Sequence, residues 1–396
     1  MEKKLVYLDN AATTSVKHEV VDIMLPFFTE KYGNPSTIYS LGTEAKEAIE
    51  DARMKVAKAL GAEKNEIYFT GSGTEADNWA LKGIAHANSD KGKHIITSKI
   101  EHHAILHTCK ALENEGFEVS YISVDENGII NLDELEKSIR KDTILISVMY
   151  ANNEIGTIQP VKEITKIAHK HNVYFHTDAV QAVGNVPIDV KDLDIDLFSL
   201  SGHKIHGPKG IGVLYIKDGV QISSFIHGGG QERGKRASTE NIPSIVGLGK
   251  AIELATQDIG ERTENMKNLR DELISRILED IPFSRLNGDK KKRLPGNVNI
   301  SFEYIEGESI LLILDQEGIC ASSGSACTSA SLAPSHVLLA IGLSPEIAHG
   351  SIRFSIGDEN TKEDIDYVME KLPGIISKLR EMSPLFEKKN KDAKIQ

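Results

Sequence analysis

The feature that most constrains the fold is a series of short β-type runs separated by helical stretches over residues 66–216. The runs are EIYFT at 66–70, HIITS at 94–98, TILISVM at 143–149, VYFHTD at 173–178, IDLFSLS at 195–201 and GIGVLYI at 210–216. Strands that alternate with helices need right-handed crossovers, and these build a mostly parallel sheet with helices on both faces. The middle of the chain is therefore predicted to be an α/β domain.

The pattern changes on either side of this region. Apolar residues recur three and four positions apart between Ala45 and Leu60, which predicts a helix, and Gly61 follows where a C-terminal cap belongs. Beyond about residue 255 come a charged helical stretch at 260–280 and a strand-like NVNISF at 297–302. This later region is typical of a second, smaller α+β domain.

These patterns predict the domain boundaries. We expect a large α/β domain over residues 15–255, and a small α+β domain made of residues 1–14 and 256–380. Residues 381–396 form a polar, lysine-rich tail that we expect to fray.

Composition excludes several classes of protein. The three cysteines, Cys109, Cys320 and Cys327, are too few for a disulfide framework and lack C-x-x-C spacing, so we expect a reducing, cytoplasmic compartment and no metal site. A net charge of -12 disfavours direct nucleic-acid binding. The chain has no run of eighteen apolar residues, so we expect no membrane partner.

A glycine-containing turn after the first run is a candidate phosphate site. Gly71, Ser72, Gly73 and Thr74 lead directly into a helical pattern. Free backbone N–H groups and the positive end of that helix would suit one phosphate, although a glycine-containing helix start without a ligand is an equally good reading of the turn alone.

Further polar residues follow the later runs. Asp178 and Gln181 come after VYFHT, and Lys204 follows His203 in GHKIHGPKG. A binding site for pyridoxal 5'-phosphate needs three features: a lysine able to form a Schiff base, a carboxylate for the pyridinium nitrogen and a phosphate cup. His102 and the adjacent His103, in another such loop, could stack on the ring or move protons.

Cys327 lies among small and hydroxyl-bearing residues in SSGSACTSAS, at 322–331. Structural cysteines are usually buried among apolar side chains, whereas this composition is typical of a mobile, solvated loop. The stretch therefore indicates a presented thiol, although a loop cysteine without a task is equally compatible with it.

Motifs along almost the whole chain resemble those of the cysteine desulfurases, the NifS/IscS-like branch of the fold-type-I pyridoxal phosphate enzymes. The motifs include YLDNAATT, YGNPST, TGSGTEADN, EHHAIL, NNEIGTIQP, HTDAVQ, SGHKIHGPKG, CASSGSACTSASLAPSHVL and SIRFSIG, in the order of that family. The match runs from about residue 5 to about residue 375.

The resemblance implies a role for each matching residue. Lys204 corresponds to the Schiff-base lysine, Cys327 to the nucleophile that accepts sulfur, and His102 to the imidazole on the ring. The implied cofactor contacts are Gly73, Thr74, Asn153, Asp178, Gln181, Ser201, His203 and Thr239, and Asn153 and Arg353 would bind the substrate carboxylate.

The resemblance also implies an activity and its partners. Members of this family convert L-cysteine to L-alanine and leave a persulfide on a cysteine of the enzyme. They then transfer the sulfur to an acceptor such as an iron-sulfur scaffold protein. Thr239 would reach the phosphate from a neighbouring subunit, which implies a homodimer.

One departure from the family pattern stands beside Thr239. The family usually has glycine where this chain has Ser238, and serine would be strained there if the position needs a positive φ angle.

Other functions are compatible with parts of this pattern. A selenocysteine lyase or a small-amino-acid aminotransferase would share the fold, but an aminotransferase has no use for a presented thiol. A sulfur carrier or scaffold without turnover would have no need for Lys204 and Asp178.

Overall fold

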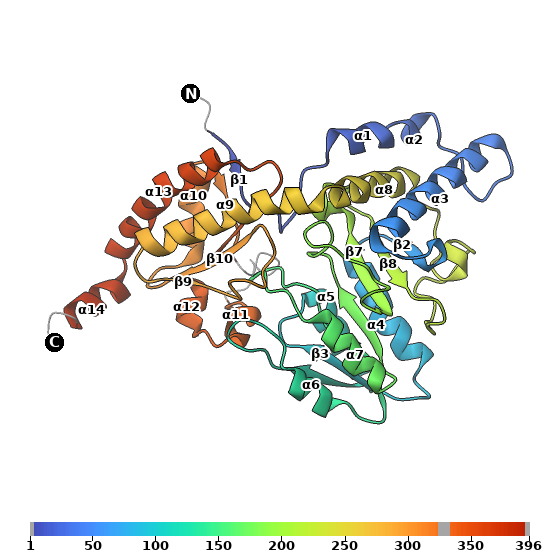
Figure 1. Cartoon of the computed structure of the whole chain (residues 1–396), viewed down its shortest axis with the longest axis horizontal. Coiled ribbons are helices and arrows are strands. Elements are labelled where there is room, and N and C mark those ends of the chain that lie inside the picture. The colour runs from blue at the N-terminus through green and yellow to red at the C-terminus, as the bar shows by residue number, and fades with distance from the viewer. Residues whose placement is uncertain (1–3, 324–332, 393–396) are drawn as a thin grey trace.

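The computed structural model describes residues 4–323 and 333–392, and its largest element is a seven-stranded sheet (Figure 1). In spatial order the strands are β2 (Ile67–Thr70), β8 (Gly212–Ile216), β7 (Leu197–Ser201), β6 (Tyr174–Asp178), β5 (Thr143–Ser147), β3 (His94–Ser98) and β4 (Glu118–Ile122). Neighbours pair in parallel except at β8, which is antiparallel to β2 and β7. The predicted α/β fold with a mostly parallel sheet is confirmed.

Both faces of this sheet are buried except at the edge strand β4, which is why the other strands do not alternate between buried and exposed residues. Successive residues of one strand enter different cores: Leu197 packs with α4 (Gly73–Ala87) and α5 (His103–Asn114), and Phe198 packs on the opposite face. The helices on that opposite face are α1 (His18–Met24), α2 (Pro26–Thr29), α3 (Ser40–Leu60), α6 (Leu132–Ser138), α7 (Val161–Lys170) and α8 (Ile242–Thr256).

A second lobe is built on a three-stranded antiparallel sheet of order β12-β10-β9. Its elements are α9 (Ile259–Asp280), β9 (Ser284–Leu286), β10 (Asn297–Phe302), α10 (Gly307–Gln316), β11 (Ile319–Cys320), α11 (His336–Ala340), α12 (Pro345–His349), β12 (Ser351–Ser355) and α13 (Lys362–Glu381). The N-terminal strand β1 (Val6–Tyr7) pairs in parallel with β11. The first residues of the chain therefore lie with its last third, as Figure 1 shows.

Within the predicted tail, residues 384–392 form a helix, α14 (Pro384–Asp392). The ring of Phe386 lies 5.7 Å from that of Tyr304 and 6.2 Å from that of Phe283, measured between centroids. These aromatic contacts dock α14 on the second lobe. Within residues 4–323 and 333–392, no helix combines the length and apolar character that crossing a bilayer requires.

Candidate active site

A cavity of about 410 Å³ lies at the carboxyl ends of the central strands, where open α/β sheets bind their ligands. Of the predicted site residues that the structure describes, every one except Thr239 lines it. The predicted residues in its wall are Gly73, Thr74, His102, Asn153, Asp178, Gln181, Ser201, His203, Lys204 and Arg353, and His103 joins them. The fold thus brings together residues from positions 73 to 353 of the chain.

The phosphate cup predicted from the sequence is the first turn of α4. Ser72 is the N-cap of this helix, and its Oγ accepts a hydrogen bond from the Glu75 N–H at 3.1 Å. A Cβ atom at Gly73 would lie 2.8 Å from Val180 Cγ2 and 3.3 Å from Ser201 Cβ, so glycine leaves the backbone room at this turn. The helix N-terminus, with Ser201 near it in the cavity wall, is suited to an anion.

His203 lies on this side of the cavity, and its imidazole is neutral at neutral pH. Burial and the neighbouring Lys204 lower the pKa of His203 to about 4. Its Nδ1 atom lies 3.1 Å from Thr13 Oγ1.

Asp178 ends β6 at the bottom of the cavity and is buried. Its Oδ1 accepts a hydrogen bond from the Val180 N–H at 3.0 Å. Burial raises the pKa of Asp178, while the nearby cationic groups of His102 and Lys204 act in the opposite direction. A cationic ring nitrogen placed against this carboxylate would be strongly attracted, because little water competes for the charge.

Lys204, at the end of the short 3-10 helix η2 (Gly202–Lys204), contacts the N-terminal segment. Its Nζ donates to the carbonyl oxygens of Ala11 at 2.6 Å and Ala12 at 2.7 Å. Gln181 Nε2 also donates to the Ala11 oxygen, at 3.0 Å. A loop almost two hundred residues earlier in the chain therefore orients both polar side chains.

Arg353 enters the cavity from β12, and its side chain is almost fully buried. Its Nη1 donates to the Asn153 carbonyl at 2.9 Å and its Nη2 to Asp9 Oδ1 at 3.0 Å. Its Nε is buried and has no hydrogen-bond partner among the described residues. A buried guanidinium with an unused donor is suited to an incoming carboxylate.

Cys327 lies outside the described residues, but the structure defines the chain on both sides of it. The backbone of Ser322 pairs with that of Arg353 through hydrogen bonds of 2.7 and 3.1 Å. On the far side, Ser335 Oγ donates to Glu154 Oε2 at 2.5 Å, and His336 Nε2 lies 3.0 Å from the Glu101 carbonyl oxygen. Both flanks are thus attached to residues of the cavity wall.

Three buried acids in the cavity wall were missed by the sequence reasoning: Asp77, Glu101 and Glu154. Burial raises the pKa of Glu101 to about 8 and that of Glu154 to about 7, and burial together with Asp178 raises that of Asp77. Each lies within three residues of a predicted site residue, and this adjacency is the signal that could have found them.

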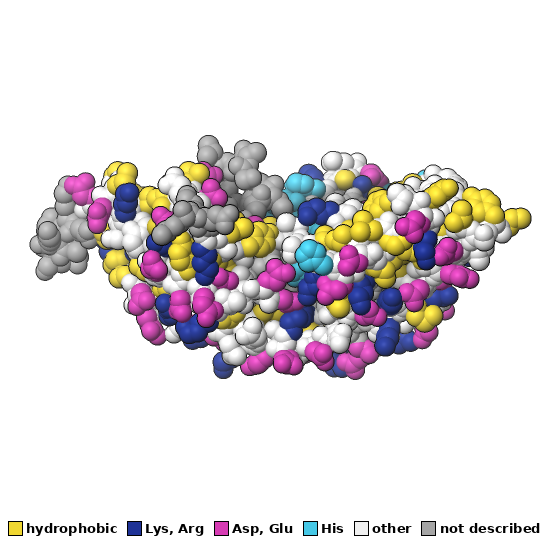
Figure 2. Space-filling view, turned by 90° about the horizontal axis from the view of Figure 1, so that it is seen from above, with side chains coloured by type: hydrophobic (Ala, Val, Ile, Leu, Met, Phe, Trp, Pro, Cys, Tyr) yellow, Lys and Arg dark blue, Asp and Glu magenta, His cyan; other side chains and the backbone are white. Residues whose placement is uncertain are grey.

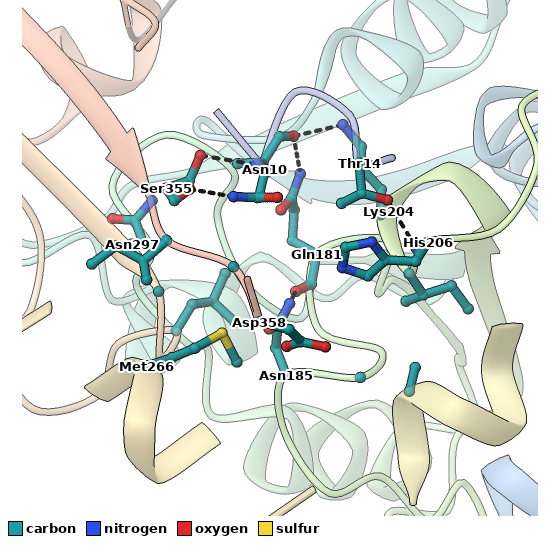
Figure 3. Close-up of a pocket in the computed structure, with 18 of the residues that line it drawn as sticks. Asn10, Thr14, Gln181, Asn185, Lys204, His206, Met266, Asn297, Ser355 and Asp358 are labelled. Carbon is teal, nitrogen blue, oxygen red and sulfur yellow. Dashed lines mark hydrogen bonds between the residues drawn. The ribbon is translucent and has the colours of Figure 1, made fainter. Parts of the chain in front are cut away.

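A smaller polar cavity of about 60 Å³ adjoins the first one (Figure 3). Gln181 and Lys204 line both cavities and therefore stand between them. Asp358 also lines this cavity, and its carboxylate accepts hydrogen bonds from Arg262 Nη1 at 2.9 Å and from Lys17 Nζ at 3.2 Å.

Thr239 does not line the main cavity. It lies with Ser238 beside a separate cavity of about 160 Å³, which Gly71 and Arg236 also line. Ser238 has a φ angle of 113°, so the position does take the left-handed conformation that serine disfavours.

The site fits pyridoxal phosphate. A helix N-terminus with a crowded glycine suits the phosphate, a buried carboxylate suits the ring nitrogen, and Lys204 projects into the same cavity. The Nε of Arg353, which has no partner among residues 4–323 and 333–392, is a donor suited to a substrate carboxylate.

Comparisons with known proteins agree with one another. The family model described as Aminotransferase class-V matches residues 6–368. Proteins named cysteine desulfurase IscS are 62% identical to this chain: that of Methanosarcina thermophila over 98% of this chain and 96% of its own length, and that of Clostridium botulinum over 99% and 100%. A solved structure described as a NifS-like protein has a TM-score of 0.90 and 42% identity, covering 95% of this chain and 100% of that one.

Proposed function

This chain belongs to the class-V aminotransferase family, and on that premise we propose how its residues perform the reaction of a pyridoxal phosphate-dependent cysteine desulfurase. The protein converts L-cysteine to L-alanine and retains the sulfur as an enzyme persulfide, for iron-sulfur cluster or other sulfur-cofactor biosynthesis. In this reaction the carbon–sulfur bond of cysteine breaks, a sulfur–sulfur bond forms on the enzyme, and the thiol proton of the enzyme is transferred to the β-carbon of the product.

The cofactor supplies an electron sink for the charge that develops on the substrate α-carbon. Gly73, Thr74, Ser201 and His203 would hold its phosphate, and Asp178 its ring nitrogen. Gln181 would donate to the ring oxygen and His102 would cover the ring face. Burial raises the pKa of Asp178, His102 and Lys204 act in the opposite direction, and a cationic ring nitrogen would favour the ionised carboxylate further.

Lys204 is the residue that we assign to removal of the substrate α-proton. Its Nζ is held by the carbonyl oxygens of Ala11 and Ala12, which stabilise the ammonium form after the proton has been taken. The same contacts keep the amino group at the wall of the cavity while the substrate is in place.

Arg353 and Asn153 are assigned to the substrate carboxylate. The guanidinium of Arg353 is already oriented by Asn153 and Asp9, so little side-chain entropy is lost when it binds the carboxylate. This contact would select α-amino acids over amines.

We assign the persulfide to Cys327. The support is the attachment of both flanks of its segment to the cavity wall, through Ser322 to Arg353 and through Ser335 to Glu154. Cys109 is unsuited to the role because it is buried, and burial raises its pKa to about 12, so almost no thiolate forms at neutral pH.

We further propose that the protein is a homodimer acting in the cytoplasm and that it hands sulfur to an iron-sulfur scaffold protein. Large apolar side chains gather on α1, α2 and the turn before α3, at one end of the molecule in Figure 2. The exposed ones are Val21, Leu25, Phe28, Tyr32, Ile38 and Tyr39. A contiguous apolar surface of this kind is typical of a subunit interface, and we call it the apolar arm.

The observation that carries the function is the meeting of Lys204, Asp178, the phosphate cup and Arg353 in one cavity. The test is release of alanine and sulfide from L-cysteine, with and without a reductant, by protein with a visible absorbance band that borohydride abolishes. Without reductant, we expect the amount of alanine formed to equal the amount of sulfur bound to the protein. With reductant, we expect more alanine than bound sulfur. A protein that lacks the band or releases no alanine would contradict the proposal.

A further inference from the structure

Strand β2 lies at the edge of the central sheet, and charged side chains bind its unpaired backbone groups. Within the described part of the chain, its only strand neighbour is β8. On the free edge, the Phe69 N–H donates to Glu232 Oε2 at 2.9 Å, and the Ile67 carbonyl accepts from Arg53 Nη1 at 2.8 Å. Exposed strand edges are usually covered or charged, and here Arg53 and Glu232 serve in place of a further strand.

Arg53 and Glu232 also bind each other. Arg53 Nη1 and Nη2 donate to the two carboxylate oxygens of Glu232, both at 2.8 Å, and both side chains are buried. A bidentate pair of this kind holds its partners in a defined orientation. The segment that carries Glu232 is thus fixed along the strand that leads to the phosphate cup.

A second pair lies at the end of the same strand. Glu75, in the first turn of α4, accepts the Gly71 N–H on Oε2 at 2.8 Å. Arg236 donates to the same carboxylate, from Nε to Oε1 at 2.7 Å and from Nη2 to Oε2 at 3.1 Å. A Cβ atom at Gly71 would lie 2.7 Å from Glu75 Oε2, so a larger residue here would displace the Glu75 carboxylate from its present position.

The segment that contains Glu232 and Arg236 has a strained backbone. Glu232, Arg233 and Ser238 have φ angles of 45°, 57° and 113°. Such conformations are disfavoured for residues that carry a Cβ atom and persist only where the surroundings enforce them. The two arginine–glutamate pairs supply that enforcement, and Thr239 follows directly after the last strained residue.

We propose that Glu75 and Arg236 are positioning residues for the cofactor phosphate. Glu75 fixes the backbone immediately before the cup, and Arg236 fixes Glu75 to the segment that carries Thr239. The inference rests on the phosphate cup assigned above. The pair affects cofactor affinity without touching the cofactor. It also connects the phosphate cup to Thr239, the residue assigned to contact the phosphate bound by the neighbouring subunit.

The experiment compares two aldehydes that differ only in the phosphate. Full-length Glu75→Gln, Arg236→Gln and the double variant are stripped of cofactor and titrated with pyridoxal 5'-phosphate and with pyridoxal, following the visible band. Glu75→Gln keeps an acceptor for the Gly71 N–H but removes the charge. Each single variant should bind pyridoxal phosphate at least tenfold more weakly than the parent, whereas its affinity for pyridoxal should change less than twofold.

Two further measurements separate positioning from general destabilisation. The double variant should lose little more affinity than either single one, because the two residues act through one contact. Inorganic phosphate should protect the parent from thermal unfolding more than it protects the variants. Arg140→Gln is the matched control, since Arg140 pairs with Asp142 near the opposite edge of the sheet and its loss should change neither affinity. If Arg236→Gln does not fold, Arg236→Lys keeps the charge without the planar fork and should show the same selective loss.

Unchanged affinity for pyridoxal phosphate in folded single variants would refute the proposal, and so would an equal loss for both aldehydes. A parent protein that forms no borohydride-sensitive band would refute the proposed function instead. In that case phosphate protection would still report whether the pair positions an anion site.

Discussion

At the scale of single residues, burial raises the pKa of four carboxyl groups in the cavity wall. The pKa of Glu101 is raised to about 8 and that of Glu154 to about 7, and the pKa values of Asp77 and Asp178 are raised as well. At Asp178 the neighbouring His102 and Lys204 oppose the effect of burial, whereas at Asp77 the neighbouring Asp178 adds to it. The pKa of each carboxyl group thus depends on its neighbours as well as on its burial.

The assignment of Cys327 predicts that a variant without this thiol performs only the early steps of the reaction. Cys327→Ala should bind the cofactor and still remove the substrate α-proton, because Lys204 and Asp178 are intact, yet form no alanine and no persulfide. Exchange of the α-proton with deuterated solvent measures the removal of that proton, and mass spectrometry of the protein detects the persulfide. Cys109→Ala and Cys320→Ala are the controls and should retain activity, with a packing cost on the order of 1 kcal/mol. Alanine production by Cys327→Ala at the parent rate would show that the thiol is incidental.

Glu101 predicts a pH-dependent stability. Its carboxyl accepts hydrogen bonds from the Met149 N–H and Ser98 Oγ in a fully buried position. Its pKa is about 8 in the folded protein, raised by burial from 4.5, so between these values the unfolded chain is ionised while the folded one keeps its proton. This group's contribution to stability is complete below pH 4.5 and is lost as the pH rises toward 8.

Glu101→Gln cannot ionise, so it should gain stability relative to the parent as the pH rises from 5 to 8, by on the order of 1 to 3 kcal/mol. Thermal unfolding of both proteins across this range measures the difference. A difference that does not depend on pH would contradict the raised pKa.

At the scale of elements, the strands of the central sheet end at the cavity, and the loops that follow them carry the chemistry. β3 precedes His102, β6 ends at Asp178, and β7 ends three residues before Lys204. Because these strands are parallel, their carboxyl ends lie on one edge of the sheet. The segment carrying Thr239 is different, since it is held at the sheet edge by ion pairs and has a strained backbone.

Ser238→Gly should stabilise the protein. Glycine adopts a φ of 113° without the clash that a Cβ atom causes, and this relief outweighs the added entropy of the unfolded chain, for a net gain of about 0.5 to 1 kcal/mol. Ser238→Ala keeps the Cβ atom and should gain nothing, so it is the matched control. Urea unfolding measures both, and a glycine variant no more stable than the alanine variant would show that the position is not strained.

At the scale of the whole molecule, two lobes share the site. The large lobe supplies the phosphate cup, Asp178 and Lys204, while Arg353 comes from β12 of the second lobe. The N-terminal segment contributes to both, because Asp9 binds Arg353 and the Ala11 carbonyl binds Lys204. A change in the relation of the lobes would therefore alter the substrate contacts more than the cofactor contacts.

The apolar arm predicts the quaternary structure. Phe28→Asp and Ile38→Asp place a charge on a surface that a second subunit would bury, so they should shift the protein from dimer to monomer in sedimentation experiments. Cofactor binding should weaken as well, because Thr239 would no longer reach the neighbouring phosphate. Leu312→Asp introduces the same charge at an exposed position on α10 and should leave the dimer intact. A parent protein that is monomeric would refute the assignment of Thr239.

Much of the architecture was determined by the sequence alone. Each of the six β-type runs contains a strand, and the helix predicted from Ala45 to Leu60 ends at Gly61 with a φ of 70°. These features are local, because apolar spacing and capping residues act within a few positions of the chain. The edge strand β4 was missed, since EVSYI is only partly buried and its apolar signal is weak.

The tertiary structure alone decided which distant residues meet. Residues that follow strands could be assigned to one edge of the sheet before the structure was known, whereas the contacts of Arg353 with Asn153 and Asp9 depend on how the second lobe packs. The same holds for Glu75 with Arg236 and for the buried acids, because burial and ion pairing arise from neighbours far apart in sequence. Local patterns specify elements and their ends, but the charge state and orientation of a side chain are set by everything packed against it.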